Sequence, residues 1–144
     1  HQDRSFRERC YGICEGMKDG EIREAYPESY KAWYAADPDH FFPDGERKTE
    51  SPRQFHHRAV NAIREAATRY PGKKIAIVTH FGVIETAYRT AQNIPLGTHC
   101  RMPVLNTSIN RFRWTGGTLV LLQWGEASHL EEGRKPPVDY YRHY

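Results

Sequence analysis

A run of four apolar residues near the middle of the chain, residues 75–78, is the strongest hydrophobic signal in the sequence. Three of them are β-branched, which predicts a strand buried on both faces inside a parallel sheet covered by helices. The polar pair Thr79 and His80 follows, and residues 83–92 are helical in composition. We therefore expect His80 at the carboxyl end of a central strand, beside a helix N-terminus, where open α/β sheets bind anions. A hydrogen-bonded residue that merely ends a strand is the alternative interpretation of His80.

The helix with the clearest start and stop signals is predicted over residues 52–70. Ser51 precedes it as an N-cap, Pro52 suits its first position, and Gln54 completes a capping box. A Pro-Gly pair at 71–72 ends it. The apolar residues at helical spacing should form its buried face: Phe55, Ala59, Ile63, Ala66 and Tyr70.

Three residues of this helix fall off the apolar face: His56, His57 and Arg58. Adjacent helical residues project about 100° apart, so the two histidines are poorly placed to share a metal ion. All three are predicted to be surface residues.

Two shorter helices are predicted before the long one. Asp19 is a candidate cap for the first, and Pro27 is suited to begin the second. The aromatic residues of the second helix should lie in the core: Tyr30, Trp33 and Tyr34. Residues 36–50 are predicted to be a long loop, and loops of that length are usually functional.

A β-hairpin is predicted after the helix at 83–92. Two runs rich in β-branched and aromatic residues, 106–114 and 118–124, flank Gly116-Gly117. Two glycines between strands are typical of a primed hairpin turn. The last residues, 131–144, are polar and are predicted to be a tail.

Composition narrows the class of protein further. A chain of 144 residues fits one domain, and no stretch approaches 18 apolar residues, so we expect neither a membrane span nor a membrane partner. The net charge of +3, with both signs interspersed, would assist an anionic small molecule but does not indicate nucleic-acid binding. The three cysteines show no disulfide pattern, which favours a cytoplasmic location.

The motifs that are missing exclude several kinds of chemistry. The sequence contains no metal-binding His-Glu-x-x-His, no nucleotide-binding glycine loop and no Gly-x-Ser-x-Gly elbow, so neither a metal nor a cofactor is expected. What remains is His80 together with one carboxylate, Glu8, between Arg7 and Arg9. Phosphoryl transfer needs such cations and a proton donor. Taken alone, the Arg-Glu-Arg cluster is better explained as an exposed ion cluster.

Several segments resemble, in the right order, the histidine phosphatase superfamily and its phosphoglycerate mutase-like branch. The similar segments are residues 6–17, 21–30, 43–46, 77–83 and 106–109. Each motif is weak by itself, but the ordered set covers most of the chain and is unlike a chance match.

This resemblance implies a three-layer α/β/α fold with a phosphate pocket at the carboxyl ends of the strands. In that family a first histidine, within an Arg-His-Gly motif, carries the phosphoryl group. His80 matches the second histidine, which stabilises the transferring group, and Glu8 matches the proton donor. Arg7, Tyr11 and Phe81 are expected to bind the substrate.

The sequence also departs from the family. It contains no Arg-His-Gly motif, and Phe81 stands where the family usually has glycine. Either the backbone, without the freedom of glycine, is pushed away from the phosphate, or the Phe81 ring narrows the pocket. We therefore predict an α/β fold in which residues 1–130 form an incomplete histidine phosphatase domain without its N-terminal central strand.

Two functional hypotheses follow from these expectations. The first is that the complete protein hydrolyses a small phosphorylated substrate through a phosphohistidine intermediate, while these residues alone are inactive. The alternative is a non-catalytic phosphate-binding or interaction module that associates into a homo-oligomer through an open strand edge.

Overall fold

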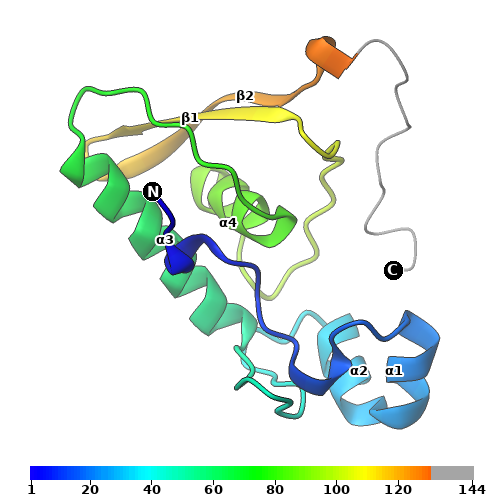
Figure 1. The fold of residues 1–144 in the computed structure, drawn as a ribbon. Helices are drawn as coiled ribbons and strands as arrows, with labels where there is room; N and C mark the ends of the chain where they lie inside the picture. The colour runs from blue at the N-terminus through cyan, green and yellow to red at the C-terminus, as the bar shows by residue number, and fades with distance from the viewer. Residues whose placement is uncertain (131–144) are drawn as a thin grey trace.

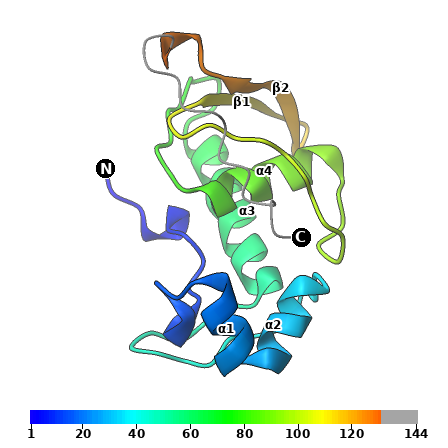
Figure 2. The same cartoon turned by 90° about the vertical axis from the view of Figure 1, so that its right-hand side faces the viewer.

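The computed structural model describes residues 1–130, which form a mixed α/β fold. Its main elements are α1 (Asp19–Ala25), α2 (Pro27–Tyr34), α3 (Pro52–Arg69), α4 (Phe81–Gln92), β1 (Ile109–Thr115) and β2 (Thr118–Glu126). Single 3₁₀ turns occur at η1 (Arg4–Phe6), η2 (Gly12–Cys14) and η3 (Ser128–Leu130). The hairpin lies over α4, α3 runs beside α4, and α1 and α2 lie together at the far end (Figures 1 and 2). The tail predicted at 131–144 lies outside the described residues.

The long helix α3 begins where the sequence predicts, because both halves of its capping box form. Ser51 Oγ accepts a hydrogen bond from the N–H of Gln54 at 3.2 Å, and Gln54 Oε1 accepts one from the N–H of Ser51 at 3.3 Å. Tyr70, predicted on the buried face, instead follows the last turn and is 49% exposed. The hydrophobic pattern therefore holds for the first turns of the helix and fails at its end.

Helix α1 begins by a different mechanism from the one predicted. Lys18 occupies the cap position, and its N–H donates to Glu21 Oε2 at 2.6 Å. Asp19 is the first helical residue, and its Oδ2 accepts a hydrogen bond from the Tyr30 hydroxyl of α2 at 3.0 Å. The carboxylate of Asp19 therefore links the two short helices and does not cap the first one.

Two apolar clusters hold the described part of the chain together. The first joins α3 to α4 through Phe55, Ala59 and Val83, with Phe6 packed against them. The second contains buried Cys14, Ile22 and Phe42, with partly buried side chains around them, including Tyr11, Tyr30 and Trp33. Tyr30 and Trp33, predicted in the core, pack against this cluster but are only partly buried, whereas Tyr34 is 45% exposed.

The strand predicted at residues 75–78 is not formed. These residues belong to no helix or strand, and Ile75, Ile77 and Val78 are 43%, 41% and 100% exposed. A strand needs a hydrogen-bonded neighbour, and the sheet within residues 1–130 consists of β1 and β2 alone. The prediction of a buried parallel strand here is therefore wrong for the part of the chain that the structure describes.

The β-hairpin forms as predicted and closes at Gly116-Gly117. Both glycines have positive φ, +57° and +80°, as a primed turn requires. The antiparallel register pairs Thr115 with Thr118 across the turn. On the inner face, the Trp124 ring lies 4.6 Å from the Tyr88 ring of α4, which attaches the hairpin to the helix.

The loop at residues 36–50 also forms as predicted, without helix or strand. Within residues 1–130, no helix combines the length and the apolar character that crossing a membrane requires.

Replacing Gly116 with alanine should destabilise the fold, because its φ of +57° lies in the left-handed region. No atom lies within 4 Å of the position that a Cβ would take, so only the backbone is strained. We expect the free energy of unfolding in urea to fall by about 1 kcal/mol. Gly116→Asn should lose less, since asparagine tolerates this conformation, and Gly97→Ala, at an open site without positive φ, should lose nothing. Equal losses for both alanine variants would contradict this account.

Candidate functional site

The carboxylate of Glu8 binds two backbone N–H groups that lie far apart in the sequence. Its Oε1 accepts from the N–H of Arg9 at 2.8 Å, and its Oε2 accepts from the N–H of Gly82 at 3.0 Å. Gly82 is the second residue of α4, where backbone N–H groups have no partner inside the helix. The positive end of the helix dipole also favours a negative charge there. This contact fixes the Glu8 carboxylate against the start of α4.

Glycine at position 82 is required by the space that Glu8 occupies. A Cβ at this position would lie 2.3 Å from Glu8 Oε1 and 3.0 Å from Cε1 of Phe55. Any side chain would therefore displace either the carboxylate or the Phe55 ring.

His80 lies at the N-cap of α4, so its predicted place beside a helix N-terminus is confirmed. Its carbonyl oxygen accepts a hydrogen bond from the N–H of Ile84 at 3.2 Å, and the residue is exposed. The strand expected to precede it is the part of the prediction that fails, as described above.

A cavity of about 260 Å³ opens beside Glu8. It lies between the two apolar clusters, with Trp33 on one wall and Phe55 on the other. Among the five predicted site residues, Glu8, Tyr11 and Phe81 line it, whereas Arg7 and His80 do not. The structure thus brings three of the predicted residues into one cavity.

Arg9, which the sequence indicates only as a cation beside Glu8, supplies a buried cation to this cavity. It is 7% exposed, and its Nε donates to the carbonyl of Glu50 at 2.8 Å. Its guanidinium carbon lies 5.0 Å from the centre of the Tyr11 ring. Burial lowers the pKa of Arg9 from its ordinary value and raises the pKa of Tyr11 to about 12. At neutral pH the pair therefore presents a guanidinium and a neutral phenol to the cavity.

His40, from the long loop, is a second lining residue that sequence reasoning missed. Its Nδ1 lies 2.6 Å from the carbonyl oxygen of Asp37, and its Nε2 lies 3.3 Å from Nη2 of Arg9. Because Arg9 can only donate, Nε2 accepts and Nδ1 carries the proton. Burial, with a smaller contribution from the charge of Arg9, lowers the pKa of His40, so the ring is neutral at pH 7.

Arg58, predicted to be a surface residue, is instead largely covered, with a side chain that is 16% exposed. Its Nε and Nη2 donate to the two carboxylate oxygens of Glu50, both at 2.7 Å. Glu50 also accepts from Nη2 of Arg7 at 3.2 Å, and Arg7 does not line the cavity. Glu50 and Arg58 are eight residues apart and Glu50 lies in a loop, so no helical spacing signals this pair.

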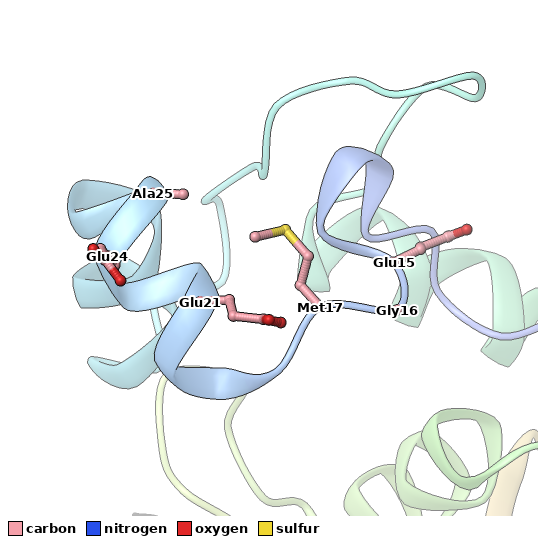
Figure 3. A pocket seen from close by; sticks show the side chains of 6 residues that line it. All are labelled: Glu15, Gly16, Met17, Glu21, Glu24 and Ala25. Carbon is pink, nitrogen blue, oxygen red and sulfur yellow. The ribbon is translucent and has the colours of Figure 1, made fainter.

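A separate, shallow depression lies near α1. Figure 3 shows its lining, Glu15, Gly16, Met17, Glu21, Glu24 and Ala25. The charged side chains there are carboxylates, which would repel a phosphate group. This depression is therefore not a candidate substrate site.

Within residues 1–130, no three or more His, Cys, Asp and Glu side chains are grouped so that they could hold a metal ion. The lining of the cavity beside Glu8 includes two guanidinium groups, Arg9 and Arg89, and three carboxyl groups, Glu8, Asp37 and Glu85. Glu85 is paired with Arg89 at 2.8 Å, which leaves Arg9 and Glu8 as the charged groups that a substrate would meet first. This combination suits an oxyanion substrate and acid–base chemistry.

Comparison with known proteins identifies the class of protein that carries this site. Residues 1–127 match the family model of the histidine phosphatase superfamily, branch 1. The chain belongs to that superfamily, which confirms the resemblance found in the sequence.

Two relatives from Arabidopsis thaliana are similar to the chain. One is phosphoglycerate mutase-like protein 4, 36% identical over 131 residues, which are 90% of this chain and 54% of the relative. The other is a metal-independent phosphoserine phosphatase, 30% identical over 126 residues, which are 87% of this chain and 50% of the relative. The chain thus spans about half the length of each.

Gly82→Ala should displace the Glu8 carboxylate, because the new Cβ would lie 2.3 Å from Oε1. We expect the free energy of unfolding to fall by about 1–3 kcal/mol, measured by chemical denaturation. Gly20→Ala is the matched control, since Gly20 is also the second residue of its helix but has no atom within 4 Å of the position that a Cβ would take. That variant should be neutral or stabilising. A Gly82→Ala protein as stable as Gly20→Ala would contradict the close contact with Glu8.

The free energy of unfolding should fall as the pH drops below about 6.5, the usual pKa of histidine, because the unfolded chain then binds protons that the folded chain does not bind. The lowered pKa of His40 gives this sign: the stabilisation is complete above the unfolded pKa and declines below it. His40→Gln should reduce the loss of unfolding free energy between roughly pH 7.5 and 5.5. Asn61→Gln, at an exposed residue that does not titrate, should leave it unchanged. An unaltered pH dependence in His40→Gln would rule out this role.

Proposed function

We propose that the complete protein is a phosphomonoester hydrolase working through a phosphohistidine intermediate, and that Glu8 is its proton donor. The observation that carries the proposal is the Glu8 carboxylate, held between the N–H groups of Arg9 and Gly82 on the wall of a cavity. Membership of the superfamily and similarity to a phosphoserine phosphatase support this assignment. The three-layer α/β/α fold implied by the family is part of the same proposal.

The reaction would proceed in two steps. A histidine nitrogen forms a bond to phosphorus while the bond to the leaving oxygen breaks, and protonated Glu8 gives its proton to that oxygen. The Glu8 carboxylate then takes a proton from water, whose oxygen attacks phosphorus and releases inorganic phosphate and the histidine. Glu8 ends protonated, as it began. Its two backbone contacts permit this, because each carboxylate oxygen keeps a further lone pair.

The other proposed site residues have distinct tasks. His80, two residues before Gly82, would stabilise the transferring phosphoryl group. Tyr11 and Phe81 line the cavity and would contact the leaving group. Arg7 would bind phosphate with the donors left over from its contacts to Glu50 and to the carbonyl of Arg4, both at 3.2 Å, since its side chain is 42% exposed and a guanidinium has five N–H groups.

In the family, the nucleophilic histidine lies within an Arg-His-Gly motif. The sequence of 144 residues contains no such motif. The activity is therefore proposed for the complete protein. Hydrolysis is favoured over phosphoryl transfer between substrates because the long loop at residues 36–50 offers few cations that could bind a second phosphate group. One of them, Arg47, is already paired with Glu15 at 2.8 Å.

A second candidate function is a phosphate-binding or interaction module without catalysis. It is favoured by the missing Arg-His-Gly motif and by the exposed residues Ile75, Ile77 and Val78, which another chain could cover. The experiment below separates the two candidates, because this module would bind phosphate without turnover and would self-associate.

In the complete protein, Glu8→Gln and His80→Ala should each lower kcat for an alkyl phosphomonoester, such as glycerol phosphate, by roughly 100-fold or more. Glutamine keeps the shape of Glu8 but cannot exchange a proton. Glu24→Gln and His57→Ala, at exposed positions, are the controls and should keep full activity. Hydrolysis at wild-type rates by both site variants would refute the mechanism. Phosphate binding by the wild type without any turnover would support the second candidate.

A further inference from the structure

We infer that Arg58 is a positioning residue, which holds the backbone before Glu8 so that the Glu8 carboxylate meets the start of α4. The inference rests on the proposed role of Glu8 as proton donor. Arg58 does not line the cavity and would act only through Glu8.

Arg58 binds the carbonyl groups of the segment that ends at Glu8. Its Nη1 donates to the carbonyl of Ser5 at 2.8 Å and to that of Arg7 at 3.1 Å. Its Nη2 donates to the carbonyl of Glu8 at 3.3 Å. One guanidinium from α3 therefore gathers three carbonyl oxygens of a segment that lies about 50 residues earlier in the sequence.

Glu50 fixes the guanidinium that makes these contacts. The pair is bidentate, and both side chains are largely covered, at 16% and 14% exposed. Burial, the largest single influence, opposes the charge of Glu50, but the hydrogen bonds and charge of Arg58, the charge of Arg7 and the N–H of Cys10 together outweigh it and hold the pKa of that carboxyl below its usual value. Glu50 is therefore an anion wherever the protein is folded at neutral pH, and Arg58 has little freedom to turn.

Glu50 also holds the backbone that follows Glu8. Its carbonyl accepts from Nε of Arg9 at 2.8 Å, and its Oε2 accepts from the N–H of Cys10 at 3.4 Å. Glu8 is thus anchored on both sides, by Arg58 before it and by Glu50 after it. Removing Arg58 would release the first anchor and leave the Glu50 carboxylate without its main partner.

Phe55 connects the same arginine to the other half of the Glu8 contact. The guanidinium carbon of Arg58 lies 5.0 Å from the centre of the Phe55 ring. The Cε1 atom of that ring also limits the space at Gly82, whose N–H binds Glu8. Arg58 therefore contacts the backbone of Glu8 and also the Phe55 ring beside Gly82, so it supports both residues of the Glu8–Gly82 hydrogen bond.

Lysine should not replace Arg58, although it preserves the charge. An ammonium group is a point donor with three protons and cannot bind both oxygens of Glu50 and three carbonyls in one plane. Arg58→Lys is therefore the informative variant. Arg53→Lys is its matched control, because Arg53 lies on the same helix and makes a bidentate pair with Asp39, at 2.7 and 2.8 Å, at an exposed site.

The first measurement is the amide proton resonance of Gly82 in the 144-residue chain, which reports the hydrogen bond to Glu8 without requiring activity. The chemical shift of this proton in Glu8→Gln gives the value expected when the carboxylate is lost. Arg58→Lys should move the resonance at least half of the way to that position, and Arg53→Lys should leave it in place. An unmoved resonance in Arg58→Lys would overturn the inference.

The second measurement is hydrolysis of glycerol phosphate by the complete protein. Arg58→Lys should lower kcat about 10- to 100-fold, as expected for a displaced proton donor, while KM changes less than about threefold. A rise in KM with unchanged kcat would overturn the positioning role. If the complete protein hydrolyses no phosphomonoester, the proposed function fails, and the Gly82 resonance alone still decides whether Arg58 positions Glu8.

A variant that fails to fold would not prevent a decision. Glu50→Gln retains a side chain of the same shape and weakens the hold on Arg58, so it should shift the Gly82 resonance in the same direction by a smaller amount. No shift in that folded variant would count against the inference.

Discussion

The contact between the Glu8 carboxylate and the N–H of Gly82 joins two segments that are 74 residues apart, and the site depends on it. It works because an anion meets the unsatisfied amides at the positive end of a helix. Glycine at 82 allows the approach, and the covered pair of Glu50 and Arg58 holds the approaching backbone. These interactions together place one carboxylate against the wall of a cavity.

The cavity itself follows from the division of the core into two apolar clusters. One cluster belongs to α3 and α4, and the other belongs to the short helices and the long loop. Arg9 and His40 line the space between them, and their hydrogen bond ties the loop to the segment that carries Glu8. The loop therefore contributes to the lining of the candidate site, and the expectation that this long loop is functional stays a prediction.

Features that depend on neighbours in sequence could be predicted from the sequence. The capping box at Ser51 and Gln54 and the turn at Gly116-Gly117 formed as expected, because each requires only a few adjacent residues. The strand at 75–78 could not be judged in this way, since a strand exists only if a partner pairs with it. A hydrophobic run shows what could be buried, but β1 and β2, the strands within residues 1–130, pair with each other and not with residues 75–78.

The candidate site was predictable only in part, for the same reason. Glu8, Tyr11 and Phe81 were selected through the family resemblance, and the structure places them around one cavity. His40 and Arg58 were missed because their partners are distant in sequence: Arg9 lies 31 residues from His40, and the carbonyl groups that Arg58 binds lie 50 or more residues away. No local pattern distinguishes such an arginine from one on a solvated helix face. Its importance became visible only from the hydrogen bonds it makes in the folded chain.

The central claim is that Glu8 gives a proton to the leaving oxygen. The most direct test is to measure kcat/KM of the complete protein for phosphomonoesters whose leaving groups range from a nitrophenol to an alkyl alcohol. The wild type should depend only weakly on the leaving group, because Glu8 protonates it. Glu8→Gln should lose progressively more activity as the leaving group becomes more basic, reaching roughly 100-fold or more for the alkyl ester. The same loss for every leaving group would contradict the claim.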